Sequence, residues 1–597
     1  EMLEKDGMTG ALITPDASLA LRVSARLQYW GIKAAPEDGA RLLETPLGRF
    51  ICAGVKAATN DLAPVALLDL LKSPFTALGD SAEKTLEHTA ALEDMVLRGP
   101  RPWPGFDGLD RSLTAAFNAA SARVKSVERS AALEETRAEL SGWLKEFRNR
   151  IEKQQALFSS ENPQEFKALL TAHIEMMETM AETDQTEGAE ILWSGEQGRA
   201  AKKLFSGLLE HADLMPPMQG RDYLLFIQDQ LAQSRYKCET HPRIKIITPE
   251  RAHLLRTDIN IIAGLTEENW PGRKREKFWL SPELREKLGL APIETEIGDA
   301  AFDFVQAVSN KNAVMTRAER NSSAPTVSSP FITRLETVLT GLGIEQKLNP
   351  KSKILDINAA LHRPAKIRPI DPPAPRPPEK FRPRKFSVSA IERLLRDPYA
   401  VYARHILKLY PKDPVDADPS FAERGNIIHA ALEEFKKTYP KKLPDNALEK
   451  LLEIGESAFE KRMDNPSVRA FWWPRFERMA EWFIHYERAR EGFARTLKTE
   501  VPGRLNIETE KGKFVLTAIA DRIDALMDDS LSIIDYKTGG VPSKRDVENG
   551  IAPQLTLEAL IALSGGFEGI DAKDVGMIEY WKLSGGRPAG KVTQIED

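Results

Sequence analysis

The clearest pattern of hydrophobic and polar positions lies in the last hundred residues of the chain. Short apolar or alternating runs predict strands at 502–509, 513–524, 531–539 and 577–583, and apolar residues at helical spacing predict a helix at 553–563. Helical spacing dominates the stretch before them. Helices followed by strands, a helix and a strand are typical of a mixed sheet flanked by helices, so we predict one α/β domain over residues 386–597.

The first half of the chain combines two kinds of pattern. Apolar runs at 10–16, 244–249 and 259–265 predict short buried strands, and residues 17–31 predict an amphipathic helix that ends at Gly31. The stretch between them repeats apolar residues every three or four positions, which predicts helices. The expected fold class is therefore multidomain α/β, an α/β core with a helical insertion. The predicted segments are 1–75 (α/β), 76–243 (helical) and 244–345 (α/β).

Residues 346–385 predict a linker between these halves. Eight prolines fall between Pro364 and Pro383, a composition that favours an extended spacer with partial polyproline II structure. The same segment is rich in Arg and Lys. It is either a solvated tether or a contact for DNA or a protein partner, and the sequence leaves both open.

Composition and charge narrow the picture only moderately. A chain of 597 residues exceeds one hydrophobic core, and 42% hydrophobic with 29% charged residues is typical of globular proteins. No apolar run is long enough for a membrane-spanning helix, so no membrane association is expected. The net charge of −5 gives no global sign of nucleic-acid binding, although a basic channel can exist at any mean charge. Two cysteines, Cys52 and Cys238, cannot form a disulfide framework or a four-cysteine metal site, which favours a cytoplasmic location.

The strongest chemical signal is IIDYKTGG, residues 533–540. Side chains alternate along a strand, so Asp535 and Lys537 share one face, while Tyr536 points away and keeps its backbone carbonyl free to turn toward a metal. Asp521 falls near the end of the preceding predicted strand, and the short LMDDSL turn can bring the two carboxylates together. Paired carboxylates hold hard divalent cations, and a neighbouring ammonium can orient a water molecule. The pattern predicts phosphodiester hydrolysis.

Three more residues are candidates for the same site. His429 lies in a predicted helix with Gly425 one turn before it, and a neutral imidazole is a good ligand beside carboxylates. Gln554 begins the helix at 553–563, where its amide can contact a phosphate or a base. Glu500 is a weaker candidate, either for a second metal or for orienting Lys537.

Taken in order, these residues resemble the PD-(D/E)XK nuclease family in its RecB-like form. The resemblance implies a Mg²⁺-dependent nuclease domain, with Mn²⁺ as the alternative ion, in which Lys537 positions the attacking water. The family's glutamine usually opens a Gln-x-x-x-Tyr motif, but here Glu558 stands in the tyrosine's place. The residues that carry the resemblance are Gly425, His429, Asp521, Asp535, Lys537 and Gln554, and the implied metal ligands are His429, Asp521, Asp535 and the backbone of Tyr536.

Sequence stretches along most of the chain also resemble the AddB family of helicase–nuclease subunits in its alphaproteobacterial form. The similar stretches include ALITPDASLALRV (11–23), IIAGLTEENWP (261–271) and VMTRAER (314–320). The resemblance implies a helicase-like core in residues 1–345 and an exonuclease that processes DNA ends in double-strand break repair by recombination. It also implies binding of double-stranded ends and single strands, and a heterodimer with an AddA-type partner.

Two departures from these families change the expectation. GGRPAGKV (585–592) has Walker-like spacing, but Val592 replaces the required Ser or Thr and no helix follows, so we predict a degenerate helicase-like region without ATP hydrolysis. Asp397 stands where many family members have the first of four cysteines, so no iron–sulfur cluster is expected, and helix packing around Trp472, Trp473 and Trp482 must hold the domain. Two alternatives remain: a non-catalytic DNA-binding scaffold, or an active helicase whose P-loop lies outside this chain.

Overall fold

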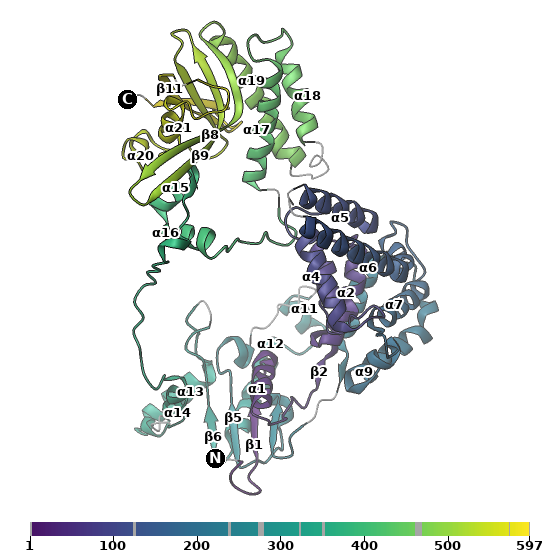
Figure 1. The fold of residues 1–597 in the computed structure, drawn as a ribbon. Coiled ribbons are helices and arrows are strands. Elements are labelled where there is room, and N and C mark those ends of the chain that lie inside the picture. Colours follow the sequence, from purple (N-terminus) through teal and green to yellow (C-terminus); the bar gives the residue numbers. More distant parts are fainter. Residues whose placement is uncertain are drawn as a thin grey trace. The chain divides into compact units, whose positions relative to one another are not determined.

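The computed structural model divides the chain into two compact units, which we describe separately (Figure 1). Unit 1 comprises residues 1–97 and 102–368, and unit 2 comprises 98–101 and 369–597. The short 98–101 segment groups with unit 2 because Arg98 and Pro100 form bridges with residues of the 413–417 loop. Cys238 lies outside the described residues. The structure describes residues 3–122, 127–236, 240–272, 280–321, 324–348, 353–418, 420–459, 468–571 and 573–595.

Four strands of unit 1, from both predicted α/β segments, join in one parallel sheet of order β4-β1-β5-β6. Ile13, Ile247 and Ile262 lie in its core, which explains the nearly continuous apolar runs of these strands. Helix α1 starts where Asp16 accepts the Leu19 backbone N–H. The elements of this sheet layer are β1 (Gly10–Ile13), α1 (Ala17–Tyr29), β4 (Ile244–Ile247), β5 (Ile259–Ile262), α11 (Pro282–Lys287), α12 (Ile293–Val308) and β6 (Ala313–Met315).

The helical insertion of unit 1 begins at Pro46, within the segment 1–75 that was predicted as α/β, and not at residue 76. Its centre is α2, whose residues are almost all buried against neighbouring helices. A two-stranded ribbon of β2 and β3 accompanies it. The elements are β2 (Ala40–Arg41), α2 (Pro46–Thr59), α3 (Pro64–Leu71), α4 (Ala82–Leu92), α5 (Gly105–Ser121), α6 (Val127–Ser159), α7 (Phe166–Ala181), α8 (Gly188–Leu192), α9 (Gly195–Glu210), α10 (Gly220–Gln233) and β3 (Arg235–Tyr236).

The linker prediction is only partly correct. Helix α14 (Lys353–His362) follows α13 (Pro330–Gly341) and occupies part of the predicted spacer, because ILDINAAL supplies apolar residues at helical spacing before the first proline. From residue 363 to 378 the chain has no regular structure, as the prolines predict.

Unit 2 contains a six-stranded mixed sheet of order β12-β11-β10-β9-β7, with β8 also paired to β9. Strands β10 and β11 are parallel, and β9 is antiparallel to both β8 and β10. The elements are β7 (Lys385–Ser387), α15 (Val388–Arg396), α16 (Pro398–Val401), α17 (Phe421–Thr438), α18 (Ala447–Phe459), α19 (Trp473–Arg490), β8 (Ala494–Thr509), β9 (Gly512–Leu526), β10 (Leu531–Lys537), α20 (Lys544–Glu548), α21 (Gln554–Leu563), β11 (Val575–Leu583) and β12 (Gly590–Ile595).

Helices cover the two faces of this sheet in different sets (Figure 1). Helices α17, α18 and α19 pack on the face that carries Ile534, Tyr536 and Trp581, and we call this the helical-bundle face. Helices α15 and α21 pack on the face that carries Ile533 and Tyr580, which we call the site face. The tryptophans expected to hold the domain do lie in or against the helical-bundle core.

Three local expectations can be checked against this fold. Asp521 lies inside β9 rather than near its end, because β9 is longer than its apolar run suggested. Gly590 begins strand β12, which agrees with the rejection of GGRPAGKV as a P-loop. Asp397 accepts the Ala400 backbone N–H and so caps α16. Among the described residues, none of the helices is long and apolar enough to cross a membrane.

Candidate active site

The candidate site begins where β9 stops pairing with β10. The last paired residues are Arg522 and Ile534, and beyond them the Tyr536 backbone N–H donates to Asp521 Oδ2 at 2.8 Å. The Asp521 carboxylate therefore accepts the hydrogen bond that a backbone carbonyl of β9 would accept in a continued ladder. This places Asp521 beside Asp535, as the short turn predicted, although Asp521 comes from the middle of its strand.

Glu500 lies opposite Asp521 on the neighbouring strand. Thr499 pairs with Arg522 and Val501 with Ala520, so the residue between them faces Asp521 across the ladder. Glu500 has φ of +46°, a left-handed conformation that residues other than glycine seldom adopt. Such strain collects at functional sites, where the surrounding fold holds it in place. The sequence signal for Glu500 was weak, because its importance comes from strand pairing.

His429 reaches the same place from helix α17, which covers the opposite face. Its Nε2 lies 3.0 Å from the Tyr536 carbonyl oxygen, and its Nδ1 lies 3.7 Å from Asp521 Oδ2. Burial lowers the pKa of His429, which favours the neutral ring. With the proton on Nε2 for the Tyr536 carbonyl, the Nδ1 lone pair faces a carboxylate oxygen. The Tyr536 carbonyl, which was predicted to turn toward a metal, therefore lies within hydrogen-bond distance of His429. One helical turn earlier, a Cβ at Gly425 would lie 3.1 Å from Thr538 Oγ1, so this glycine permits the chain's own turn to approach α17.

The donor atoms of His429, Glu500 and Asp521 fit a divalent cation. One ligand atom from each lies within 4.8 Å of the others, and carboxylate oxygens with a neutral imidazole are suitable ligands for such an ion. Burial, and next the charge of Asp535, raise the pKa of Asp521 from 3.8 to about 7. Burial and Asp521 also raise the pKa of Glu500. Each of these carboxylates makes ionisation of the other less favourable, so a positive charge between them would stabilise their ionised forms.

Asp535, Lys537 and Gln554 form a connected group beside this cluster. Lys537 Nζ lies 2.7 Å from Asp535 Oδ2 and donates to Gln554 Oε1 at 3.0 Å. Gln554 Nε2 donates to Asp535 Oδ1 at 2.5 Å. Burial opposes the charge on Lys537, but Asp535 outweighs it, so the pKa of Lys537 is raised and the ammonium is kept. The alternation argument is confirmed, because Asp535 and Lys537 point to the site face while Tyr536 packs in the helical-bundle core.

Glu558 is a member of the site that the sequence marked only as a departure from the family motif. Its side chain is 1% exposed, and Oε1 lies 3.3 Å from Gln554 Nε2, while Oε2 has no hydrogen-bond partner among the described residues. Burial raises the pKa of Glu558 well above its usual range, and Asp535 raises it further. The ring of Tyr580 on β11 lies 5.9 Å from Lys537 Nζ and lines the same part of the site.

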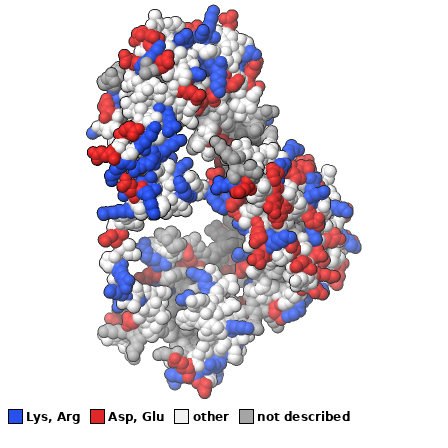
Figure 2. All heavy atoms as spheres, in the orientation of Figure 1, with Lys and Arg blue, Asp and Glu red and all other residues white. Residues whose placement is uncertain are grey.

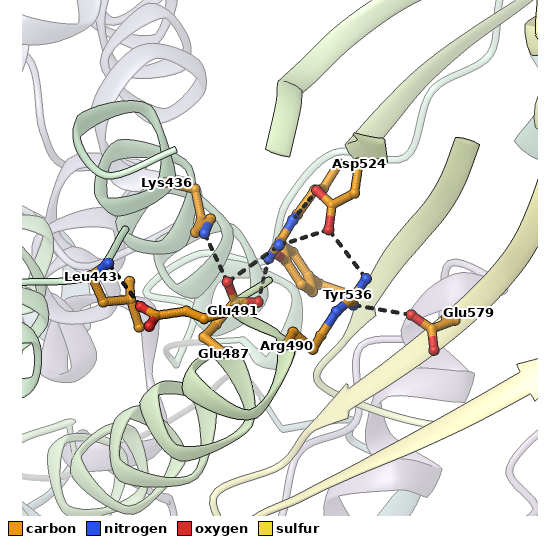
Figure 3. Close-up of polar contacts among 9 residues, drawn as sticks. Lys436, Leu443, Glu487, Arg490, Glu491, Asp524, Tyr536 and Glu579 are labelled. Carbon is orange, nitrogen blue, oxygen red and sulfur yellow. Dashed lines mark hydrogen bonds and ion pairs between the residues drawn. The ribbon is translucent and has the colours of Figure 1, made fainter. Parts of the chain in front are cut away.

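A second set of charges lies on the helical-bundle face of the same strands (Figure 3). Arg522 Nη1 donates to Glu487 at 2.6 Å and its Nε donates to Asp524 at 2.7 Å. Lys436 and Arg490 complete the network with Glu487, Asp524 and Glu579. Arg522 Nη1 also lies 3.3 Å from the Tyr536 hydroxyl, which links the network to the residue between Asp535 and Lys537. The network was not predicted. Its buried members are Lys436, Glu487, Arg490, Arg522, Asp524 and Glu579.

All predicted site residues thus lie around the end of β10, but they fall into two groups. His429 and Asp521 gather with Glu500, and Asp535, Lys537 and Gln554 gather with Glu558. The assignment of metal ligands among them stays a prediction.

Comparisons with known proteins agree with this geometry. Residues 385–596 match the PD-(D/E)XK nuclease superfamily, so the C-terminal region is a PD-(D/E)XK nuclease domain. This superfamily implies nuclease activity, and its members commonly use divalent metals.

The chain also has relatives that extend beyond this domain. It is 27% identical over 415 residues to an uncharacterized protein of Rickettsia typhi, covering 68% of this chain and 46% of that protein. A protein of Rickettsia felis is 26% identical over 421 residues, 68% of this chain and 47% of that protein. The chain thus spans about half the length of these curated relatives. A weaker match, 26% over 184 residues, joins 29% of this chain to 16% of an ATP-dependent helicase/deoxyribonuclease subunit of Streptococcus agalactiae serotype Ia.

Proposed function

We propose that this protein is a DNA nuclease that depends on a divalent cation, Mg²⁺ or alternatively Mn²⁺, and hydrolyses phosphodiester bonds in its C-terminal domain. The observation that carries the proposal is the convergence of His429, Glu500 and Asp521 within 4.8 Å, beside the Asp535–Lys537 pair. One helix and three strands supply these five side chains, three in the cluster and two in the pair beside it. A surface hairpin with an incidental ion pair would not bring them together.

Each residue has a separate role in this proposal. Asp521, Asp535 and His429 hold the cation, with Glu500 as an additional ligand and the Tyr536 carbonyl orienting the imidazole. A bound divalent cation would lower the pKa of a coordinated water and polarise the scissile phosphate. Lys537 keeps its proton and donates hydrogen bonds to the attacking water or to the charge that develops on the phosphate. Gln554 accepts from Lys537 and donates to Asp535, which fixes the ammonium relative to the carboxylate.

A wider role follows from the similarity to a helicase/deoxyribonuclease subunit. We infer that the chain is an exonuclease subunit that works with a helicase partner of the AddA type on DNA ends, in double-strand break repair by recombination. Unit 1, with its four-stranded parallel sheet, is then a helicase-like region that binds and steers DNA without hydrolysing ATP. The support is the match to the streptococcal protein, together with GGRPAGKV forming a strand start instead of a phosphate loop.

The proposal is tested with linear single-stranded DNA and purified protein. Cleavage should require Mg²⁺ or Mn²⁺, stop with EDTA, and be lost in Asp521→Ala and Lys537→Ala while DNA binding persists. Full cleavage by either variant would refute the assignment. DNA binding without any cation-dependent cleavage by the wild type would instead support the non-catalytic scaffold. DNA-stimulated ATPase activity of the full-length protein would identify the third alternative, a helicase with its P-loop outside this chain.

A further inference from the structure

A groove of about 770 Å³ adjoins the candidate site within unit 2. Its walls are residues 502–504 of β8, 517–519 of β9, the start of α15, and the 565–568 turn that follows α21. Gln554 and Glu558 form the wall nearest the site. Gln554 contacts both Asp535 and Lys537, so the groove runs directly up to the proposed catalytic group.

The groove presents groups that bind phosphates. Lys385 and Arg504 are exposed cations on its walls, and Arg504 Nε donates to Asn506 Oδ1, which orients the guanidinium. The N-terminal ends of α15 and α21 also lie at the groove, and helix N-termini favour anions. Ile519, 60% exposed, adds an apolar surface against which a base can pack. Glu568 is the one exposed acidic side chain among the described lining residues.

Glu558 gives an independent sign that a ligand enters here. It lines the groove, its side chain is almost completely buried, and its Oε2 is without a hydrogen-bond partner in the described part of the chain. A buried polar atom without a partner is costly, which suggests that a bound molecule completes it. A protonated carboxyl at this position donates a hydrogen bond to a phosphate or base oxygen.

Charge at the surface continues the groove outward (Figure 2). Lys and Arg side chains gather over α15 and the ends of β8 and β9. The exposed basic residues of these elements, of the β8–β9 turn and of the segment leading into β7 include Arg384, Lys385, Arg393, Arg396, Lys511 and Lys513.

We propose that this groove holds one strand of nucleic acid, with Arg504 and Lys385 on its phosphates and Glu558 on the nucleotide next to the scissile bond. The assignment of the neighbouring bond as scissile rests on the proposed nuclease function. A volume of about 770 Å³ lies in the range of about 300–1,000 Å³ of small-molecule sites, which suits individual nucleotides of one strand. We therefore assign a single strand as the occupant, and a duplex is an outcome of the test.

The test measures the affinity for a short fluorescent oligodeoxynucleotide by anisotropy, in EDTA so that no cleavage occurs. Arg504→Ala and Lys385→Ala should each weaken single-strand binding about five- to tenfold and lower the slope of log affinity against log salt by about 0.7. Arg495→Ala, which removes an exposed arginine from the other end of β8, is the matched control and should leave both unchanged. Glu558→Gln keeps a donor and should bind better than Glu558→Leu.

Cleavage measurements separate this proposal from the nuclease assignment. Arg504→Ala should raise KM with little change in kcat, because it removes binding and not chemistry. Unchanged affinity in Arg504→Ala and Lys385→Ala would overturn the groove, even if Asp521→Ala abolishes cleavage. If the wild type never cleaves DNA but these variants lose affinity, the groove is supported and the nuclease assignment is refuted. Equal affinity for a blunt duplex, lost in the same variants, would overturn the single-strand assignment.

Discussion

The two faces of strands β9, β10 and β11 carry similar residue types with opposite electrostatic outcomes. On the helical-bundle face, three basic residues meet three acidic ones, and the charges balance. On the site face, Glu500 gathers with Asp521, and beside them Asp535 pairs with the ammonium of Lys537. Burial raises the pKa of Glu487, but Arg522 and Lys436 outweigh it and bring it down to about 2. Asp521, also buried, instead has its pKa raised to about 7.

This difference distinguishes a structural charge network from a functional one. Glu487 has its counter-charges supplied by the chain, so it stays ionised and holds α19 to the sheet. For Asp521, burial and the charge of Asp535 outweigh Lys537, so a bound cation, as we propose, would stabilise its ionised form. Burial alone does not separate the two sites. The local balance of charge does.

The largest expected effect is on catalysis from the site face. Asp521→Ala or Lys537→Ala should lower kcat by about 10³-fold or more, because each removes a group that holds the cation or the developing charge. Steady-state cleavage of linear single-stranded DNA measures it. Asp529→Asn, an exposed carboxylate on the β9–β10 turn, is the matched control and should cleave normally.

The next effect is on stability from the helical-bundle face. Arg522→Met should lower the free energy of unfolding by about 3–5 kcal/mol, because Glu487 and Asp524 are left buried without their partner. Urea denaturation, with hydrogen exchange of β10 peptides to assign the transition to this domain, provides the measurement. Arg495→Met, on the surface of β8, should change stability by no more than about 0.5 kcal/mol. A similarly small change in Arg522→Met would mean that the network contributes little.

The charge of Asp521 should destabilise the fold, whereas the charge of Glu487 stabilises it. Its pKa is higher in the folded state, about 7, than in the unfolded chain, 3.8, so the folded form binds the proton more tightly. Without metal, stability should therefore fall as pH rises from about 4 to 7 and then level off. Mg²⁺ should raise the melting temperature more at about pH 8 than at about pH 6, where protons compete for the carboxylate. Thermal denaturation with and without EDTA tests this.

Asp521→Asn serves as the control for that pH dependence. It removes the repulsion from Asp535, so in EDTA at about pH 8 it should be as stable as the wild type or more stable, by about 1–2 kcal/mol. Its melting temperature should respond little to Mg²⁺. Strong destabilisation of Asp521→Asn would show that Asp521, like Glu487, is mainly structural.

The smallest expected effect concerns Gln554. Gln554→Ala should lower kcat about tenfold, because Lys537 keeps its ion pair with Asp535 and loses only one hydrogen bond of about 1.5 kcal/mol. The KM should change less. A loss as large as that of Lys537→Ala would give Gln554 a direct role in the chemistry, and no loss would mean that Asp535 alone positions the ammonium.

Elements with a strong local period were predicted well from sequence. The strands around Asp535 and the helix beginning at Gln554 lie where their apolar patterns placed them. Strand β7 was missed because three residues carry no readable period. Helix α14 was missed because the prolines that follow it dominated the composition of the linker.

The candidate site shows the same division. Asp535 and Lys537 on one face follow from their spacing, because adjacent side chains in a strand point to opposite sides. Glu500 gained significance only through strand pairing opposite Asp521, and Glu558 only through burial with an oxygen that has no partner among the described residues. Neither property can be read from the neighbouring residues in the sequence.

The sequence by itself therefore determined which side chains of β9 and β10 share a face, since that follows from backbone geometry over two residues. Only the tertiary structure decided which buried charges are balanced. Arg522 and Glu487 are 35 positions apart, and no local pattern joins them. The energy of a charge depends on its distance from other charges and from water, and folding alone sets both. That is why the carboxylates on one face stabilise the domain, while the ionised forms of those on the other would be stabilised by the cation that we propose they bind.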